Sequence, residues 1–258
     1  MFKKIFKLAL KLALRISLIA ACAAAIAFLA ERIDELKSKG KKVVHIPFGI
    51  YERFIKRPLD CFLSTGALIV FSPILLVLTI MGYFKMKGNP FFTQKRPGRN
   101  EEIFNLIKFR SMSNAKDENG KLLPDTDRLN SYGKFIRKTS LDELPELINI
   151  VKGDMAVVGP RPLAVQYLPY YNENEKHRHD VRPGLTGLAQ INGRNAVLWD
   201  ERFKYDVDYV KHISFKKDIS ILIKTILKVF KSSDIQVRGT GNNIDFDKYR
   251  MLQNETTV

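Results

Sequence analysis

Apolar and polar positions divide the chain into two parts of different character. Before residue 87 the chain holds two long apolar runs, Ile16 to Ala30 and Cys61 to Gly82. The remainder mixes helical stretches with short strand-like ones, Ile103 to Phe109 and Met155 to Val158, which predicts a mostly helical α/β domain. Ser214 to Lys231 interleaves lysines with Ile, Leu and Phe, and this pattern predicts an amphipathic helix suited to a membrane surface.

The first apolar run follows a cationic amphipathic segment. Its five basic residues stand at near-helical spacing: Lys3, Lys4, Lys7, Lys11 and Arg15. Ile16 to Ala30 is shorter than the roughly 17 residues that a spanning helix needs. A cleaved secretory signal is one interpretation, because Ala21-Cys22-Ala23 resembles a signal-peptidase site. We favour a retained membrane helix, because amphipathic turns precede the run and the helix-like segment Glu31 to Lys39 follows it. A polar linker is predicted at Lys37 to Lys42.

The second run is long enough to cross a bilayer, but its sequence predicts a bend. Its 22 uncharged residues would extend about 33 Å as a helix. Pro73 removes a backbone hydrogen bond in the middle, and Ser72 can help to satisfy the freed groups. Basic residues flank both ends, Lys56 and Arg57 before the run and Lys87 after it, so both ends are drawn to the cytoplasmic face. A re-entrant helix broken at Ser72-Pro73 is predicted, and a proline-kinked spanning helix remains the alternative.

The composition indicates anionic partners. Lys and Arg number 43 against 27 Asp and Glu, a formal charge of +16 over 258 residues, which suits phosphorylated substrates, nucleic acid or an acidic leaflet. Aromatic residues are not interleaved with the basic clusters as stacking on bases requires, so we expect no nucleic-acid partner. Cys22 and Cys61 show neither metal-ligand spacing nor a disulfide framework.

The acidic pair Asp142-Glu143 is the centre of the candidate chemistry. It follows Arg137 closely and begins a predicted helix, Ser140 to Val151, whose N-terminus would favour ionised carboxylates and a neighbouring phosphate. Those are the conditions that a carboxylate nucleophile needs. The pair alone also has a purely structural interpretation, because Ser140 and Glu143 have the spacing of a capping box.

Basic residues in three other segments fit a phosphate site. Arg161 lies between two prolines after an apolar strand, which fixes its planar fork for bidentate phosphate binding. Lys108 and Arg110 end the strand-like stretch upstream. Residues 182–194 form a glycine-rich stretch suited to a nucleotide or sugar. The candidate binding side chains in it are Arg182, Gln190, Asn192 and Arg194. Taken alone, the Arg161 motif also suits an ordinary turn with a solvated arginine, and the Lys108 motif a solvated sheet edge.

Taken together, the motifs resemble the bacterial sugar transferases, the monotopic phosphoglycosyl transferases that start glycan assembly on undecaprenyl phosphate. The resemblance runs from Lys56 to about Phe230. In the membrane part, Lys56-Arg57-x-x-Asp60 is similar to the segment at which that family's chain enters the membrane, and Ser72-Pro73 is similar to its re-entrant break. In the catalytic part, Asp142-Glu143 is similar to the family's catalytic dyad, and its phosphate-binding cations correspond to Lys108, Arg137 and Arg161. The segment Arg182 to Arg194 matches its Pro-Gly-x-Thr-Gly loop.

The resemblance implies a ping-pong reaction. Asp142 would attack the sugar-bearing phosphorus of a UDP-sugar, release UMP and carry the phosphosugar until undecaprenyl phosphate takes it. The family further implies that the sugar is N-acetylated. Mg²⁺ held by Asp142 and Glu143, together with the fixed cations, would neutralise the phosphates. The implied place is the bacterial inner membrane, among its lipids and with the catalytic domain on the cytoplasmic face. A homo-oligomer is left open.

Four parts are therefore expected along the chain. They are a membrane-associated helix and basic linker at 1–50, a re-entrant helix at 51–86, a catalytic sugar transferase domain at 87–231 and a polar tail at 232–258. The alternative from a different functional class is a basic membrane-surface protein that binds anionic lipid without chemistry. A polytopic transferase would need many spanning helices, and the sequence has two apolar runs.

Overall fold

The computed structural model describes residues 2–37, 49–193, 198–231 and 244–255. Over these ranges the protein is mostly helical with short strands, as the sequence predicted. The α-helices are α1 (Phe2–Lys37), α2 (Lys56–Val70), α3 (Ser72–Met86), α4 (Asp125–Arg128), α5 (Ser131–Lys138), α6 (Glu146–Lys152), α7 (Glu173–Lys176), α8 (Leu188–Ile191), α9 (Trp199–Lys211), α10 (Phe215–Lys231) and α11 (Phe246–Glu255). The strands are β1 (Phe91–Pro97), β2 (Ile103–Phe109), β3 (Ala156–Val158) and β4 (Gly184–Thr186). The shorter helical turns are η1 (Tyr51–Ile55), η2 (Arg99–Glu101), η3 (Leu141–Glu143), η4 (Val165–Tyr170) and η5 (His177–His179).

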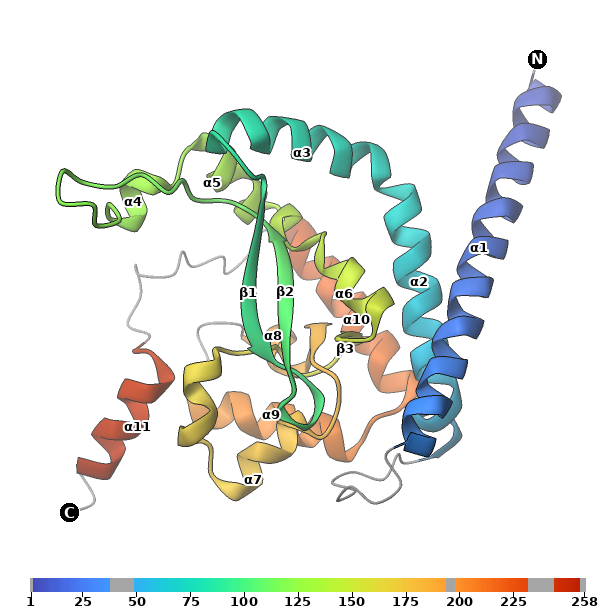
Figure 1. Ribbon diagram of the computed structural model, residues 1–258. Helices are drawn as coiled ribbons and strands as arrows, with labels where there is room; N and C mark the ends of the chain where they lie inside the picture. The colour runs from blue at the N-terminus through green and yellow to red at the C-terminus, as the bar shows by residue number, and fades with distance from the viewer. Residues whose placement is uncertain (1, 38–48, 194–197, 232–243, 256–258) are drawn as a thin grey trace.

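The N-terminal segment forms one long helix, α1, which lies along α2 (Figure 1). Ala20 and Ala27 are buried, whereas Leu18 and Ile26 are exposed, so small side chains allow close contact on one side and large apolar ones remain outside. Lys11–Leu29 is long and apolar enough to cross a membrane. The linker predicted at Lys37 to Lys42 lies, beyond its first residue, outside the described residues.

The second apolar run is broken where the sequence predicted it. α2 and α3 meet at Phe71, and the helical stretches on either side are bent by 64°. Pro73 lies in the first turn of α3, where its missing N–H costs least. The hydroxyl of Ser72 donates to the Ile69 carbonyl oxygen at 2.7 Å, which satisfies an acceptor at the end of α2.

A long hairpin and a small parallel sheet organise residues 87–231, the part of the chain expected to be catalytic and called the catalytic body (Figure 1). β1 and β2 pair antiparallel from Phe91 opposite Phe109 to Pro97 opposite Ile103, so the strand predicted at Ile103 to Phe109 is confirmed. β3 and β4 pair in parallel, and β3 begins one residue after the predicted Met155. A side chain on Gly184 would lie 2.1 Å from the Gly159 nitrogen. The glycine therefore allows the two backbones to approach.

The C-terminal half of the described chain packs α9 and α10 against this sheet. Tyr209 and Ile221 share a buried cluster with Val158 of β3. Along α10, Ile223 and Leu227 are exposed, and their helical spacing from Ile221 places them on the side opposite this cluster. The amphipathic helix predicted over Ser214 to Lys231 is thus confirmed as a helix with one buried and one partly apolar exposed face.

The helix predicted over Ser140 to Val151 is wrong in its first turn. The α-helix begins at Glu146 and is preceded by the 3₁₀ turn η3. Pro145 has no N–H to donate to the Leu141 carbonyl, which instead accepts from the nitrogen of Leu144 at 3.3 Å. The acidic pair therefore lies in a tight turn before the helix, and the helix dipole is not the main source of positive charge around it.

Candidate active site

Asp142 and Glu143 project from η3 toward cations on three other elements. Ser140 adopts a left-handed conformation (φ 55°, ψ 19°) and its side chain makes no cap hydrogen bond. Glu143 Oε1 instead accepts from Lys108 Nζ at 2.8 Å and from Arg161 Nη2 at 2.5 Å. The capping-box interpretation is therefore wrong, and Glu143 is tied to the predicted phosphate cations.

Lys108 lies between two carboxylates. At the end of β2, its Nζ is 2.8 Å from both Glu143 Oε1 and Glu146 Oε1. The pKa of Glu146 is raised to about 7, first by burial and then by the charge of Glu143. Sequence inspection missed Glu146 because a single acid in a predicted helix has no distinguishing pattern; its position three residues after Glu143 was the only available signal.

The two members of the dyad have different surroundings. Burial alone would raise the pKa of Glu143, but Arg161 and Lys108 outweigh it and hold that pKa well below its ordinary value. The pKa of Asp142 is raised to about 6 by burial and then by Glu143. Among the described residues, the Asp142 carboxylate has no hydrogen-bond donor or ion-pair partner. One carboxylate is fixed, and its half-buried neighbour is available.

Arg137 reaches the site from α5 because that helix lies very close to the chain after β2. A side chain on Gly133 would lie 1.9 Å from the Ser111 carbonyl oxygen, so only glycine allows this approach. Arg137 Nε then donates to Ser111 Oγ at 2.8 Å. The charge of Arg137 is one of three that lower the pKa of Asp142 against the effect of burial.

Arg161 is held in place through its main chain. The Pro160 carbonyl accepts from the nitrogen of Gly184 at 2.9 Å, and the Arg161 carbonyl accepts from Arg178 Nη2 at 2.7 Å. Arg178 is itself fully buried against Asp206. The turn between β3 and η4 therefore presents its guanidinium to Glu143 from a backbone that is fixed on both sides.

Asn149 fastens the helix after the dyad to the strand that carries Lys108. Its Oδ1 accepts from the nitrogen of Ile107 at 3.0 Å, and its Nδ2 donates to the Asn105 carbonyl at 2.8 Å. The side chain thus completes the open edge of β2 and fixes α6 beside it. Sequence inspection missed this residue, because an asparagine within a predicted helix gives no sign of a partner 42 residues away.

Comparison with known proteins agrees with this arrangement. Residues 51–232 match the sequence profile of a family described as bacterial sugar transferase. The chain belongs to this family. The resemblance seen in the motifs is thereby confirmed, and with it the expectation that the protein is an enzyme that transfers a sugar phosphate.

Relatives of different length share the same region. An uncharacterized sugar transferase of Bacillus subtilis (strain 168), EpsL, is 47% identical over 182 residues, which are 70% of this chain and 90% of that protein. The undecaprenyl-phosphate galactose phosphotransferase of Salmonella typhimurium is 37% identical over 199 residues, 69% of this chain and 41% of the relative. The UDP-N-acetylgalactosamine-undecaprenyl-phosphate N-acetylgalactosaminephosphotransferase of Aeromonas hydrophila is 34% identical over 227 residues, 81% and 53% of the two chains. The chain thus spans about half or less of the length of the latter two.

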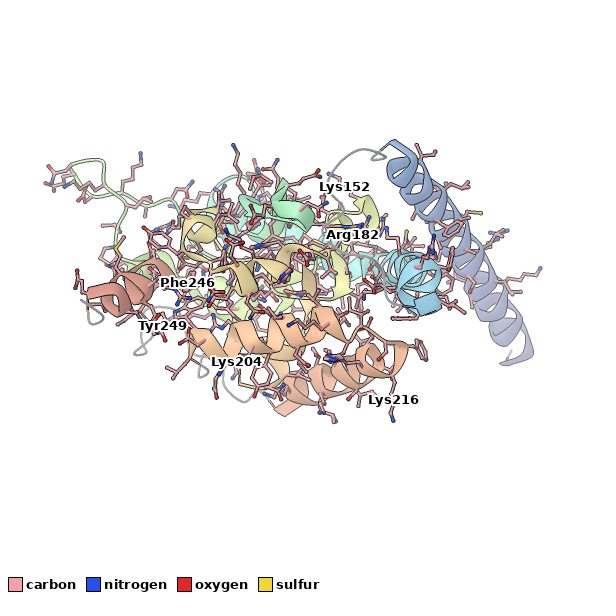
Figure 2. The ribbon with its side chains drawn as sticks, turned by 90° about the horizontal axis from the view of Figure 1, so that it is seen from below. Lys152, Arg182, Lys204, Lys216, Phe246 and Tyr249 are labelled. Carbon is pink, nitrogen blue, oxygen red and sulfur yellow. The ribbon has the colours of Figure 1, made fainter. Side chains whose placement is uncertain are left out.

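In this sugar transferase, two of the predicted arginines lie at the far end of α6 from the dyad. Arg57 Nη1 donates to the Ile150 carbonyl at 2.6 Å, and Arg182 Nε donates to the Gly153 carbonyl at 2.8 Å. Figure 2 labels Arg182 next to Lys152, the last residue of α6. The Ile150 carbonyl also accepts from the nitrogen of Gly153 at 3.1 Å, so the two arginines bind carbonyls in the last turn of α6 and just after it and thereby orient the helix.

Lys56 also faces the protein. Its Nζ lies 2.7 Å from Asp218 Oδ2 and 3.6 Å from Asp60 Oδ2. Since Lys56 is compensated in this way, and Arg57 is buried, the expectation that both helix ends are drawn to the cytoplasmic face rests on fewer exposed charges than the sequence suggested. Lys87 at the other end is exposed.

The remaining predicted residues of the glycine-rich stretch bond to their own segment. Gln190 Nε2 donates to the Leu185 carbonyl at 3.1 Å, and Asn192 Nδ2 donates to the Leu188 carbonyl at 3.0 Å. Arg194 lies outside the described residues. The structure therefore brings together Asp142, Glu143, Lys108, Arg137 and Arg161, and leaves Arg182 at the opposite end of α6.

Tyr132 connects the dyad to the broken helix, a contact that sequence inspection missed. Its hydroxyl donates to the Leu78 carbonyl of α3 at 3.0 Å, and its pKa is raised by burial and by the charge of Asp142. Leu141, next to the nucleophile candidate, packs in the same cluster as Leu78. The acidic turn thus lies directly against the apolar helix.

The donor set fits a magnesium ion shared with a phosphorylated ligand. Among the described residues, no group of three or more carboxylate, histidine or cysteine side chains gathers as a closed metal site. Mg²⁺ characteristically takes one or two carboxylates and completes its shell with water and substrate phosphates. Asp142 and Glu143 supply two such carboxylates beside three cations.

Proposed function

We propose that the protein transfers a sugar 1-phosphate from a UDP-sugar to undecaprenyl phosphate through a phosphosugar bound to Asp142. The observation that carries the proposal is the contrast within the dyad. Glu143 is held by Lys108 and Arg161, whereas Asp142 is half-buried, close to the same cations and without a partner among the described residues. A carboxylate that no hydrogen-bond donor of the protein holds can approach a phosphorus atom, whereas Glu143 is held in place by two cations.

The first half-reaction displaces UMP. A carboxylate oxygen of Asp142 forms a bond to the phosphorus that bears the sugar, and the bond from that phosphorus to the bridging oxygen of the diphosphate breaks. UMP leaves with that oxygen and its electron pair. Lys108, Arg137 and Arg161 reduce the repulsion between the anionic carboxylate and the diphosphate and stabilise charge on the departing phosphate.

The second half-reaction returns the enzyme to its starting state. A phosphate oxygen of undecaprenyl phosphate attacks the same phosphorus, and the bond to Asp142 breaks, which leaves the lipid-linked sugar diphosphate and a free carboxylate. The same cations serve both steps, because both place negative charge around one phosphorus. Mg²⁺ held by Asp142 and Glu143 would add Lewis-acid neutralisation of the donor phosphates.

Membrane attachment through a re-entrant helix is part of the proposal. It is supported by the contacts of α2 and α3, the two arms of the broken helix. α2 binds α6 through Arg57, and α3 binds α5 and its N-cap through Tyr132 and Asn130. Both arms return to one catalytic body, whereas a straight spanning helix would carry one end away from it. The outer side of the break is apolar and exposed, with Phe71 and Val77 among its residues.

This arrangement would place the dyad at the level of the lipid phosphates. Tyr132 and Leu141 join the acidic turn to α3, and the exposed apolar side of α10, including Ile223 and Leu227, is suited to lie on the same leaflet. We infer that the site faces the cytoplasm at the bacterial inner membrane, where nucleotide sugars are made and the phosphate of the acceptor is exposed.

Cysteine labelling in intact cells tests the topology. Ile50 is 73% exposed before the run and Lys87 is exposed after it, so each can be replaced by Cys in a background in which Cys22 and Cys61 are replaced by Ser. Both new cysteines should resist a membrane-impermeant reagent added outside the cells and should react after permeabilisation. Met251→Cys on α11, where the side chain is exposed, is the control for a cytoplasmic position. Labelling of either flank from outside would mean that the run spans the membrane.

The donor is proposed to be an N-acetylated UDP-sugar. The name of the Aeromonas relative, which specifies N-acetylgalactosamine, supports this donor, whereas the Salmonella relative is named for galactose. Purified protein should release UMP from at least one member of a panel of UDP-sugars, with undecaprenyl phosphate present, and only with Mg²⁺. A basic lipid-binding protein without chemistry would release none from any donor, and that result would refute the proposal.

A further inference from the structure

The C-terminal helix α11 lies beyond the region that matches the sugar transferase family, residues 51–232. It nevertheless packs on the catalytic body, at the opposite end of the molecule from α1 in both views (Figures 1 and 2). Phe246 is completely buried, and Trp199 Nε1 donates to the Ile244 carbonyl at 2.9 Å. A helix inserted in this way is a structural part of the domain, although the sequence indicated only a polar tail.

Arg250 fixes α11 to the segment that precedes Arg178. Its Nη2 lies 2.7 Å and 2.9 Å from the two carboxylate oxygens of Glu175. Glu175 is buried and also accepts from the nitrogen of Asn172 in a capping box that starts α7. A guanidinium paired with a carboxylate that is otherwise buried holds its element firmly.

Phe246 supports the aromatic rings on which Arg178 lies. It stacks on Tyr171 with ring centroids 5.2 Å apart and meets Phe203 edge-on at 4.8 Å. The Arg178 guanidinium carbon lies 5.5 Å and 5.7 Å from the centroids of these same two rings. Tyr171 and Phe203 are therefore shared between the buried arginine and the C-terminal helix.

Arg178 in turn holds the main chain of Arg161. Its Nη2 donates to the Arg161 carbonyl at 2.7 Å, while Nε and Nη2 bind Asp206 Oδ2. The Arg161 side chain reaches Glu143 at 2.5 Å. A continuous series of packed and hydrogen-bonded groups thus connects Phe246 to the dyad.

We propose that α11 is a positioning element for catalysis: by supporting the rings under Arg178 it fixes the backbone of Arg161 and so the direction of its guanidinium. The inference rests on the phosphate-binding role proposed above for Arg161. It assigns to Phe246 and Arg250, outside the family region, an effect on a site that neither touches. Loss of the support lets the turn that carries Arg161 shift, and a misplacement of about 1 Å can cost up to about 100-fold in rate.

The test compares three variants of the full-length protein in the UMP-release assay, scored per folded molecule. Phe246→Ala should lower kcat/KM for the UDP-sugar about tenfold, and Phe246→Leu, which keeps most of the buried volume, should restore most of it. Met251→Ala is the matched control on the same helix, because Met251 is exposed, and it should behave as the parent. If Phe246→Ala only reduces the amount of folded protein and leaves kcat/KM per folded molecule unchanged, α11 is merely structural and the inference is wrong.

A double variant distinguishes this inference from the proposed function. If Phe246 acts through Arg161, Phe246→Ala should cost less than about twofold when Arg161 is already replaced by Lys, because coupled positions are not additive. If the losses in kcat/KM caused by Phe246→Ala and by Arg161→Lys multiply in the double variant, the inference is contradicted. If Arg161→Lys alone leaves kcat/KM unchanged, the role of Arg161 in the proposed function is wrong, whatever α11 does. Arg250→Gln offers an independent route, since it loosens α7 without opening a cavity, and an unchanged kcat/KM in that variant would also count against the inference.

Discussion

Lys56 and Lys108 each lie between two carboxylates. The cluster around Lys56 lies beside η1, and the cluster around Lys108 includes Glu143 of the dyad. Lys56 Nζ faces Asp218 at 2.7 Å and Asp60 at 3.6 Å, and Lys108 Nζ faces Glu143 and Glu146, both at 2.8 Å. The two clusters are therefore alike in composition. They differ in whether every member has a partner.

Around Lys56 the charges are fully paired. Tyr51 donates to Asp218 Oδ2 at 2.7 Å and Tyr209 to Asp218 Oδ1 at 2.8 Å, so both carboxylate oxygens are bound. Such a cluster fixes α10 to α2 across 162 residues of sequence, and removal of one member leaves a buried charge without its partner.

Around Lys108 the charges are not fully paired. Asp142 has no partner among the described residues and its pKa is raised to about 6 by burial and by Glu143, while the pKa of Glu146 is raised to about 7. An unpaired carboxylate beside three cations is typical of a site that awaits an anionic ligand. The difference teaches that satisfaction of each group, and not the number of charges, separates the structural cluster from the reactive one.

The largest expected effect comes from removal of the unpaired carboxylate. Asp142→Asn should lower turnover on the order of 10⁴-fold or more, because only the nucleophile is lost. The melting temperature in detergent should not fall, since Asp142 makes no hydrogen bond among the described residues. Turnover within tenfold of the parent would contradict the covalent mechanism.

In the paired cluster the effect should fall on stability. Asp218→Asn leaves Lys56 facing one distant carboxylate, and we expect a loss of roughly 3 kcal/mol with kcat per folded molecule nearly unchanged. Asp208→Asn is the control: it breaks the exposed pair with Lys217 and should cost less than about 1 kcal/mol. Denaturant unfolding in micelles measures both, and equal losses would show that the buried cluster has no special importance.

Replacement of a cation at the dyad should affect the rate more than the stability. Arg161→Lys keeps the charge but loses the planar fork, and we expect kcat/KM to fall about thirtyfold, or about 2 kcal/mol. Arg128→Lys, on α4, provides a control for the general loss of a guanidinium, because Arg128 Nε binds the Ser113 carbonyl and not the dyad. Full activity of Arg161→Lys would mean that Arg161 is an ordinary turn residue.

The smallest effect is a pH dependence of stability without Mg²⁺. Because the pKa of Asp142 in the folded protein, about 6, exceeds its ordinary 3.8, ionisation disfavours the folded state as the pH rises from about 4 to about 6. The parent should therefore approach Asp142→Asn in stability below about pH 4 and be clearly less stable than that variant above pH 6.5. Thermal melts at both pH values in EDTA test this, and a constant difference between the two proteins would contradict the raised pKa.

Local patterns predicted the elements that depend on local physics. The strand over Ile103 to Phe109, the break at Ser72-Pro73 and the amphipathic helix from Phe215 each follow from periodicity or from proline chemistry, and each is present. The start of α6 was missed because the capping pattern at Ser140 was given more weight than Pro145, which lacks the N–H that an earlier helix start requires.

Contacts between distant segments were not predictable in the same way. Asn149 meets Ile107, and Lys56 meets Asp218, across sequence separations that no local pattern records. The five charged residues of the site were found only because the motifs, taken together, resemble a family. Phe246 was missed since one aromatic residue in a polar tail carries no periodic signal.

Release of UMP in the absence of undecaprenyl phosphate tests the central claim most directly. Purified protein mixed with Mg²⁺ and an accepted UDP-sugar should release a burst of about one UMP per enzyme, and intact mass should rise by one phosphosugar; Asp142→Asn should show neither. UMP that appears only after undecaprenyl phosphate is added, with no change in the mass of the protein, would mean that the sugar phosphate passes directly to the lipid and that Asp142 is not the nucleophile.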